Sequence, residues 1–360
     1  MTVSVGVHVN ADGNPCMGVA ILLVFLVLSY FSCLLKDVKV KVKGVTNIAI
    51  TDENFICATL DWWPSNKCDY NQSFNPLMIK SGGSLQDQII CQFEKQKQCP
   101  TITKEDNGFV KFTFSLNALI EKKNSNEDQL NWNPNNAIYL MKYTVSKEYN
   151  IDSYELGNER CSERVSTRID SVQYAKDITK LRYIVNSLYP NATRPKVLGP
   201  TEFYDKEWFD NFLQHVGPSV IDGVTHHIYN LGASVGVDRN FISKVQDLYF
   251  LSKIAQTFKD GSTAVKEFTP QTGTWIGESG GAYNGGGKDV FGSIGALLWH
   301  RLMGTKVLSI SHDSSPYLRT YAHCSKKGNG ITLLLINMEK WTSFNVFLVN
   351  DMNLYPDELT

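Results

Sequence analysis

Two stretches of the chain decide the fold: Tyr154-Glu155-Leu156-Gly157-Asn158-Glu159 and Thr274-Trp275-Ile276-Gly277-Glu278-Ser279-Gly280-Gly281. Each is a short apolar run that leads into a glutamate with glycine close beside it. Read as strands, they carry a carboxylate at their carboxyl end, which is the rim where parallel sheets and barrels bind their ligands. The sequence therefore predicts that Glu159 and Glu278 converge at one rim.

The segments around these stretches alternate between strand and helix patterns. Counted from the strand at 54–60, Glu159 follows the fourth strand and Glu278 the seventh. Alternation of this kind implies a parallel sheet, and the number of repeats predicts an α/β fold of the (β/α)8 TIM-barrel type. The predicted helices are 134–149, 172–188 before Pro190, a helix capped by Asp205 and closed by Gly217-Pro218, 241–258 and 290–303.

Both ends of the chain have a different character. Valines alternate with charged residues over 36–43, as in a half-exposed strand, and 318–321, 331–336 and 344–349 are typical of antiparallel strands. We therefore predict three parts: a leader at 1–35, a catalytic domain at 45–304, and a partial β-sandwich domain at 305–360.

The leader is predicted from an apolar run over 17–35, followed by small residues of the kind found at cleavage sites. A cleaved signal is favoured over a retained anchor, which would give membrane association. Either places the protein in the secretory pathway, with an extracellular, cell-wall, vacuolar or membrane-associated destination. The sequons at Asn71 and Asn191 agree with this, and the six cysteines after the leader allow one or two disulfides.

The charge composition limits the kinds of partner that the protein is expected to bind. The 360 residues include 35 basic and 36 acidic side chains, and no basic run stands out, so a nucleic-acid partner is not expected. The length accommodates a barrel domain of roughly 250 residues.

Two glutamates at one rim are the groups that a retaining glycosidase needs, one as proton donor and one as nucleophile, about 5 Å apart. Asn158, beside Glu159, is placed to hydrogen-bond a sugar hydroxyl, and Tyr229 to donate its phenol to the nucleophile. The adjacent His226 and His227 suggest metal binding or core packing. Because neighbouring side chains on a strand point to opposite faces, both are not expected to bind one ion, and no metal site is predicted.

Five stretches resemble plant heparanase-like proteins of glycoside hydrolase family 79: 55–64, 154–159, 225–232, 277–284 and 297–304. The resemblance implies a (β/α)8 barrel with an appended β-sandwich, hydrolysis of β-glucuronides with retention of configuration, and no cofactor. It implies that Glu159 is the proton donor and Glu278 the nucleophile. It also implies that Asp61, Asn158, Tyr229 and Ser84, the last in place of the family's Thr, line the pocket for the sugar.

The chain also departs from the family pattern. Lys80-Ser81-Gly82-Gly83 replaces an Arg-containing turn, and residues 65–76 leave no room for a helix. A second early helix and the eighth strand have no counterpart, because Gly287-Lys288-Asp289 leads directly into the last helix. We therefore expect an incomplete barrel with a truncated β-sandwich.

Two functions follow from these patterns. The first is a retaining hydrolase, endo- or exo-acting, on β-linked glucuronic acid in cell-wall or extracellular glycans. The alternative is a catalytically impaired, truncated paralogue that at most binds glycans. The sequence fixes neither the natural aglycone nor the oligomeric state.

Overall fold

The computed structural model describes residues 21–25, 34–51, 55, 57–61, 77–82, 110–119, 131–159, 168–233, 240, 243–244, 247–283, 299–327, 330–339 and 341–350. The chain divides into two compact units. One comprises 57–241 and 249–285, and the other comprises 1–56, 242–248 and 286–360.

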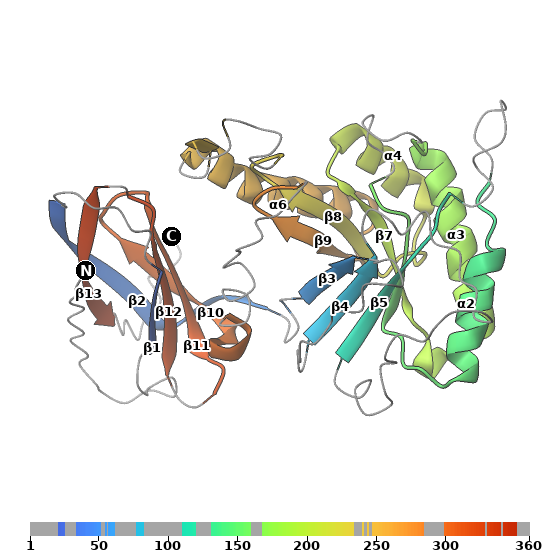
Figure 1. Ribbon diagram of the computed structural model, residues 1–360, viewed down its shortest axis with the longest axis horizontal. Coiled ribbons are helices and arrows are strands. Elements are labelled where there is room, and N and C mark those ends of the chain that lie inside the picture. The colour runs from blue at the N-terminus through green and yellow to red at the C-terminus, as the bar shows by residue number, and fades with distance from the viewer. Residues whose placement is uncertain are drawn as a thin grey trace, which may run out of the picture. The chain divides into compact units, whose positions relative to one another are not determined.

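The first unit is built on a seven-stranded sheet in which every neighbouring pair is parallel and the strands follow chain order (Figure 1). In the described part of the chain, α-helices connect the strands from β5 onward, and the sequential parallel order confirms the seven strands that the sequence predicted. The strands are β3 (Cys57–Asp61), β4 (Leu77–Gly82), β5 (Val110–Leu116), β6 (Ser153–Leu156), β7 (Lys196–Phe203), β8 (Gly223–Tyr229) and β9 (Gly273–Gly280).

Two helices of this unit begin at an aspartate cap, of which the sequence predicted the one at Asp205. Asp170 accepts hydrogen bonds from the first turn of α3 (Ser171–Leu188), and Asp205 accepts one from Trp208 N at 2.8 Å in α4 (Lys206–Val216). The other helices are α2 (Asn135–Ser146), the short η3 (Asn191–Thr193) and α6 (Leu248–Phe268).

The prediction for α6 was wrong in extent. The sequence suggested 241–258, but the helix runs from Leu248 to Phe268 and continues through Gly261. A Cβ at Gly261 would lie 3.4 Å from Thr274 Cγ2 and 3.6 Å from His226 Cε1, so the helix packs closely on β8 and β9 there. This packing outweighs the low helix propensity of glycine.

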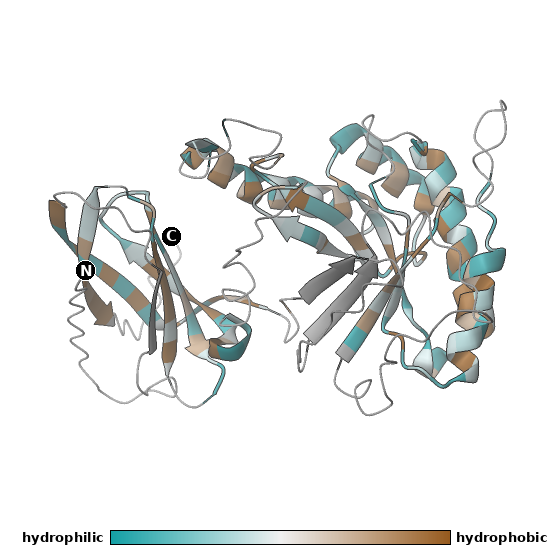
Figure 2. Cartoon of the chain, in the orientation of Figure 1, coloured by the Kyte–Doolittle hydropathy of each residue, from teal (hydrophilic) through white to brown (hydrophobic). Residues whose placement is uncertain are grey.

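The apolar core of the unit lies between the sheet and these helices (Figure 2). Tyr154 and Leu156 of β6 point to this side, which we call the helix face, and Tyr154 Oη lies 3.1 Å from Thr144 Oγ1 of α2. Ser153 and Glu155 alternate to the opposite side, which we call the inner face. The inner face is polar: Ser115 Oγ donates to Glu155 Oε2 at 3.2 Å, and both residues are buried.

The second unit contains a six-stranded sheet in the order β1-β12-β11-β10-β2-β13. Its core is formed by residues such as Val40, Leu308, Ala322 and Leu333. Strands form where the sequence predicted them over 318–321, 331–336 and 344–349, and the first two pair antiparallel with each other. The third pairs in parallel with 34–42, so the prediction of an antiparallel strand was wrong there. The strand Met303–His312 begins where the sequence predicted the end of a helix. The strands are β1 (Ile21–Phe25), β2 (Leu34–Ile50), β10 (Met303–His312), β11 (Leu318–Ser325), β12 (Ile331–Asn337) and β13 (Thr342–Asn350).

Several expectations fall outside the described residues. These are the segments in which two early helices and the eighth strand of the family pattern were expected to be missing, and the side chains of every cysteine other than Cys324. The leader also stays a prediction: β1 lies within it, and no helix in the described part of the chain is long and apolar enough to span a membrane.

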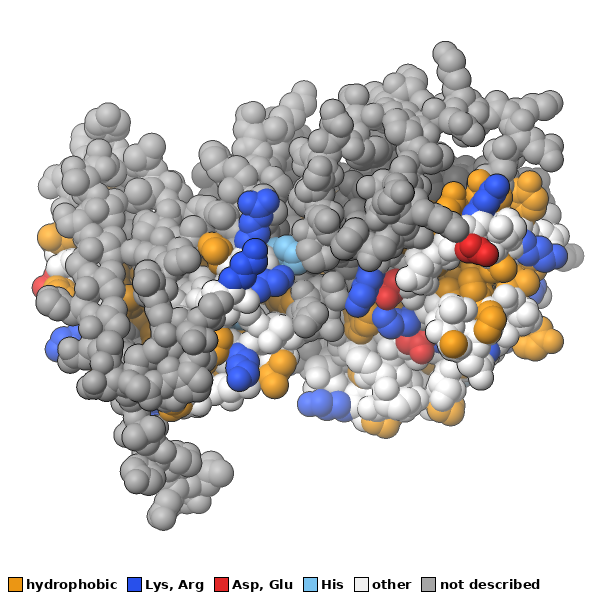
Figure 3. Space-filling model, turned by 90° about the horizontal axis from the view of Figure 1, so that it is seen from below, with side chains coloured by type: hydrophobic (Ala, Val, Ile, Leu, Met, Phe, Trp, Pro, Cys, Tyr) orange, Lys and Arg blue, Asp and Glu red, His pale blue; other side chains and the backbone are white. Residues whose placement is uncertain are grey.

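On the face drawn in Figure 3, acidic and basic side chains are both present and stand among uncharged and hydrophobic ones.

Candidate active site

Glu159 lies just beyond the carboxyl end of β6, on a backbone that turns sharply. Gly157 has φ 75° and Glu159 itself has φ 52°, both in the left-handed region. Glycine adopts this region freely, but for a glutamate it costs energy, of the order of 1 kcal/mol, and such strain concentrates at functional sites.

Thr201 of β7 holds this turn. Its hydroxyl donates to Gly157 O at 2.7 Å, and its carbonyl accepts from Glu159 N at 3.0 Å. Its own N–H donates to Thr225 Oγ1 of β8 at 3.0 Å, and its side chain is fully buried. Thr201 has φ 60°, which is exceptional for a β-branched residue. The position of Glu159 is therefore fixed by the neighbouring strand.

Glu278 reaches the inner face through a bulge in β9. Ile276 pairs with His226, but Glu278 pairs with the next residue, His227, so Gly277 is the extra residue. A one-residue insertion reverses the side-chain alternation beyond it. Glu278 consequently shares a face with His227, and a Cβ at Gly277 would lie 3.3 Å from His227 Nε2.

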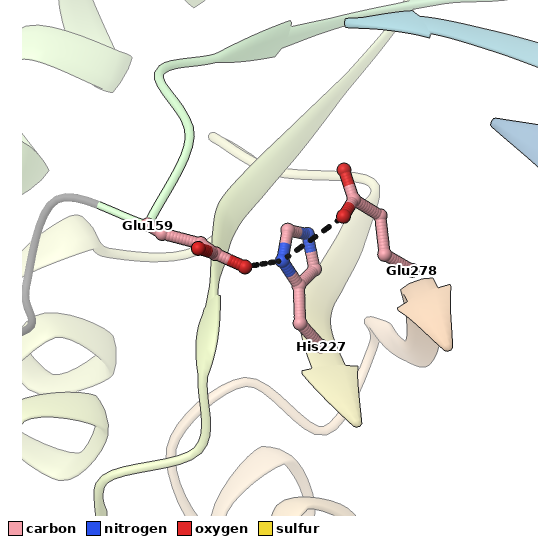
Figure 4. Close-up of side chains that lie close together, drawn as sticks. All are labelled: Glu159, His227 and Glu278. Atoms are coloured by element: carbon pink, nitrogen blue, oxygen red, sulfur yellow. Dashed lines mark hydrogen bonds and ion pairs between the residues drawn. The ribbon is translucent and has the colours of Figure 1, made fainter. Parts of the chain in front are cut away.

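His227 lies between the two carboxylates, as Figure 4 shows. Its Nδ1 is 2.9 Å from Glu159 Oε1 and 3.7 Å from Glu278 Oε2, and its side chain is fully buried. With a proton on Nδ1, the ring donates to Glu159 Oε1 and lies beside Glu278 Oε2. One imidazole thus links the end of β6 to β9.

His226 points the other way, as adjacent residues on a strand do. Its ring packs at 6.4 Å from the ring of Tyr204 and at 6.1 Å from that of Phe258 of α6. Burial lowers the pKa of His226 to about 4, and a contact with the backbone of Trp275 opposes this only in part. His226 is therefore a neutral core residue on the helix face at neutral pH.

Tyr229, two residues beyond His227, points to the inner face. Its phenol donates to Glu278 Oε2 at 3.2 Å, the hydrogen bond that the sequence suggested. Its ring forms a cluster with Phe203 at 6.1 Å and Tyr283 at 6.2 Å, and all three rings are partly exposed. Tyr283 is fixed by its backbone, because its N–H donates to Gly232 O at 3.0 Å.

The site brings one oxygen of each glutamate and one nitrogen of His227 within 4.8 Å of one another. This separation suits a nucleophile and a proton donor that act on one sugar ring, since retaining glycosidases keep their carboxyl groups about 5 to 5.5 Å apart. Inverting enzymes need about 6.5 to 9.5 Å to admit a water molecule.

The same three groups also have the spacing of a metal site. However, one Glu278 oxygen already accepts from Tyr229, and one Glu159 oxygen pairs with the imidazole. A pair of carboxylates held by hydrogen-bonding side chains has the chemistry of acid–base and nucleophilic catalysis without an ion.

The other predicted residues are placed as follows. Asn158 is buried beside Glu159, and Asp61 ends β3, although its side chain lies outside the described part. Ser84 and Asn71 also lie outside it. Asn191 begins η3 and is exposed, so its sequon is accessible.

Comparison with known proteins shows the family to which this chain belongs. The family model described as "Glycosyl hydrolase family 79, N-terminal domain" matches residues 37–74 and 106–301. The chain belongs to glycosyl hydrolase family 79. It is therefore a glycosidase by family, which agrees with the paired glutamates.

Relatives with curated descriptions support this family assignment. The chain is 34% identical to Heparanase-like protein 1 of Arabidopsis thaliana, over 89% of this chain and 77% of that protein. It is 27% identical to baicalin-beta-D-glucuronidase of Scutellaria baicalensis, over 84% of this chain and 77% of that protein.

The fold of this family 79 protein resembles that of solved glycoside hydrolases. A family 44 endoglucanase from Clostridium acetobutylium superposes with a TM-score of 0.58 at 12% identity, over 88% of this chain and 91% of that one. A xyloglucanase from Paenibacillus polymyxa superposes with a TM-score of 0.56 at 10% identity, over 88% of this chain and 90% of that one. At such identities the likeness shows the fold alone, an α/β fold with a parallel sheet.

Sequence reasoning missed His227 and Thr201. His227 could have been recognised, because it lies two residues before Tyr229 and must share its face. The role of Thr201 in holding the turn of Glu159 could not be predicted from the sequence, because it depends on a left-handed backbone at a β-branched residue.

Proposed function

We propose that this family 79 protein is a retaining β-glucuronidase that acts on β-linked glucuronic acid in cell-wall or extracellular glycans. The observation that supports this most directly is the approach of Glu159 and Glu278 to within 4.8 Å across His227. The glucuronide specificity is supported by relatives described as heparanase-like proteins and as a β-glucuronidase.

In the proposed first step, Glu278 attacks the anomeric carbon and the glycosidic bond breaks. Glu159 gives its proton to the leaving oxygen, and a covalent glycosyl–enzyme forms with inverted configuration. Tyr229 orients the attacking carboxylate through its phenol, and the imidazole of His227 keeps the two carboxylates in register.

In the second step, Glu159, now a carboxylate, removes a proton from water. The resulting hydroxide equivalent attacks the anomeric carbon and releases Glu278, and the second inversion restores the original configuration. Because the same group acts first as acid and then as base, the backbone that fixes Glu159 matters in both steps.

Asn158, Asp61 and Ser84 are proposed to bind the sugar. Asn158 is buried next to Glu159, which suits a hydrogen bond to a hydroxyl that strengthens in the transition state. No cofactor takes part in this scheme.

We also propose that the barrel and the β-sandwich are incomplete. The alignment with Heparanase-like protein 1 is 418 positions long but covers 89% of the 360 residues, or about 320, which leaves roughly a hundred positions opposite a gap. Sequencing of the transcript tests this, because recovery of the missing blocks would overturn it.

We further propose entry into the secretory pathway, which the accessible sequon at Asn191 supports. A shift in mobility on treatment of the cell-derived protein with a glycosidase that removes N-linked glycans is the expected result, smaller in Asn191→Gln and absent in Asn71→Gln/Asn191→Gln. An unmodified protein in the cytosol would contradict it.

Turnover of a chromogenic β-glucuronide tests the main proposal. The parent should release β-glucuronic acid first, as seen by proton NMR, and a chelator should leave the rate unchanged. Glu159→Gln should lower kcat by about 10² to 10⁴-fold for a poor leaving group. A folded parent without turnover would favour the alternative, an impaired paralogue that binds glycans.

A further inference from the structure

A row of lysines lies on one face of the six-stranded sheet. In β2, the alternate valines at 38, 40 and 42 are at most 3% exposed and face the apolar core of that sheet. The residues between and after them point the opposite way, namely Lys39, Lys41 and Lys43. We call this side the lysine face. Lys39 and Lys41 are exposed, and Lys43 is half-buried.

Nothing in the described part of the chain neutralises these charges. Lys39, Lys41 and Lys43 make no hydrogen bond and no ion pair there. The one carboxylate at an outward position of β2 is Asp37, and Asn345 Nδ2 donates to it at 3.0 Å. Successive lysines are about 6.6 to 6.8 Å apart, because same-side residues of a strand are two residues apart. The row is therefore an unpaired positive stripe.

The neighbouring strands add no charge to this stripe. Phe347 and Val349 of β13 pair with Lys39 and Lys41, and both are exposed. On the other side, Ser311 and Ser309 of β10 pair with Lys41 and Lys43. Cations are thus flanked by apolar surface on one side and hydroxyls on the other.

Edge protection does not explain the lysines. Charged residues, lysine above all, commonly guard exposed sheet edges against pairing with other chains. However, β2 lies between β10 and β13 and has both edges paired. The mutual repulsion of three adjacent cations is instead relieved by a ligand that carries regularly spaced negative charges.

We propose that the lysine face is a docking surface for an acidic polysaccharide, separate from the glutamate pair. A linear row of cations fits a linear polymer with a carboxylate at regular intervals. The ring of Phe347 and the serine hydroxyls suit the apolar faces and hydroxyls of sugars. The choice of a glucuronic acid polymer, rather than another polyuronate, rests on the proposed function.

Binding of a soluble β-linked polyglucuronate, measured by calorimetry at low and at physiological salt, tests this surface. We expect Lys39→Gln/Lys41→Gln/Lys43→Gln to weaken binding about tenfold at low salt and to remove most of its salt dependence. The matched control is Lys142→Gln/Lys176→Gln/Lys259→Gln, which removes the same charge from exposed helix positions in the other unit. A neutral β-glucan serves as the control polymer.

The outcomes are distinct. Weaker binding of the polymer by the lysine-face variant alone supports docking at the lysine face, provided that the same three substitutions leave turnover of a small chromogenic glucuronide unchanged. Equal binding by the first variant and the parent overturns it, and so does equal weakening in both variants, which would mean diffuse attraction to net charge. All binding measurements are made in a Glu278→Ala background, in which the polymer is not cleaved, so failure of the proposed hydrolase activity does not affect this test.

Discussion

Strand β8 carries one histidine on each face, and the two histidines have different surroundings. On the inner face, the imidazole of His227 contacts both glutamates, while on the helix face the imidazole of His226 packs against Tyr204 and Phe258. Both rings are fully buried. The difference lies in what the ring nitrogens face: Nδ1 of His227 lies beside two carboxylates, although Phe203 also packs against this ring at 6.2 Å, whereas the ring of His226 packs against two aromatic side chains. Burial alone therefore does not identify a functional histidine, whereas its face does.

The largest expected effect comes from the inner face. Glu278→Ala should lower turnover by on the order of 10⁶-fold, because it removes the nucleophile. With a dinitrophenyl glucuronide and added azide, it should form the α-glucuronyl azide, since azide occupies the place of the carboxylate. Glu159→Ala should instead form the β-azide, because Glu278 still attacks first. NMR of the products distinguishes the two, and the reverse pairing of products would exchange the roles assigned here.

The next effect concerns the helix face and stability. The pKa of His226 is lowered to about 4 in the folded protein, from 6.5 for an ordinary histidine, so the unfolded chain binds a proton that the folded one does not between these values. Unfolding is therefore favoured as the pH falls from 6.5 towards 4, by up to about 3 kcal/mol, and the stability is regained as the pH rises.

Urea unfolding of His226→Leu at pH 7.5 and pH 4.5 tests this. Between pH 7.5 and pH 4.5, the free energy of unfolding should fall by about 2 to 3 kcal/mol less in the variant than in the parent. His215→Gln, at an exposed histidine of α4, is the control and should behave like the parent. Equal losses in His226→Leu and the parent would show that His226 is not a neutral core residue.

A smaller effect is expected at the phenol that faces Glu278. Tyr229→Phe removes one hydrogen bond to a charged group, worth about 1.5 to 3 kcal/mol, and should lower kcat roughly 10- to 100-fold. The ring cluster with Phe203 and Tyr283 should persist, so the thermal midpoint should change little. A large drop in the midpoint with unchanged kcat would show that the phenol serves stability instead.

Much of the first unit follows from local patterns. The cap at Asp205, the parallel strand order, and the convergence of Glu159 and Glu278 depend on residues close in sequence or on the rule that parallel strands share a rim. Such features can be predicted, because each short segment carries the information for its own conformation.

The rest depends on long-range contacts. β2 pairs with β10 and β13, more than 250 residues later, so the order of that sheet could not be predicted from local patterns. The bulge at Gly277 and the continuation of α6 past Gly261 are likewise decided by the neighbour against which each packs. No periodicity in the segment itself encodes such a contact.

The smallest effect should come from Thr201, which joins the strand of Glu159 to that of the histidines. Thr201→Val keeps the β-branched shape but removes the hydroxyl that donates to Gly157 O, at a cost of about 1 kcal/mol in stability. Because the turn that carries Glu159 then has one hydrogen bond fewer, kcat should fall about tenfold for a substrate with a poor leaving group. It should fall little for a dinitrophenyl glucuronide, which needs no proton. Thr201→Ser keeps the hydroxyl and should restore the parent's ratio between the two substrates. Equal losses for both substrates would mean that Thr201 supports the fold and does not position the proton donor.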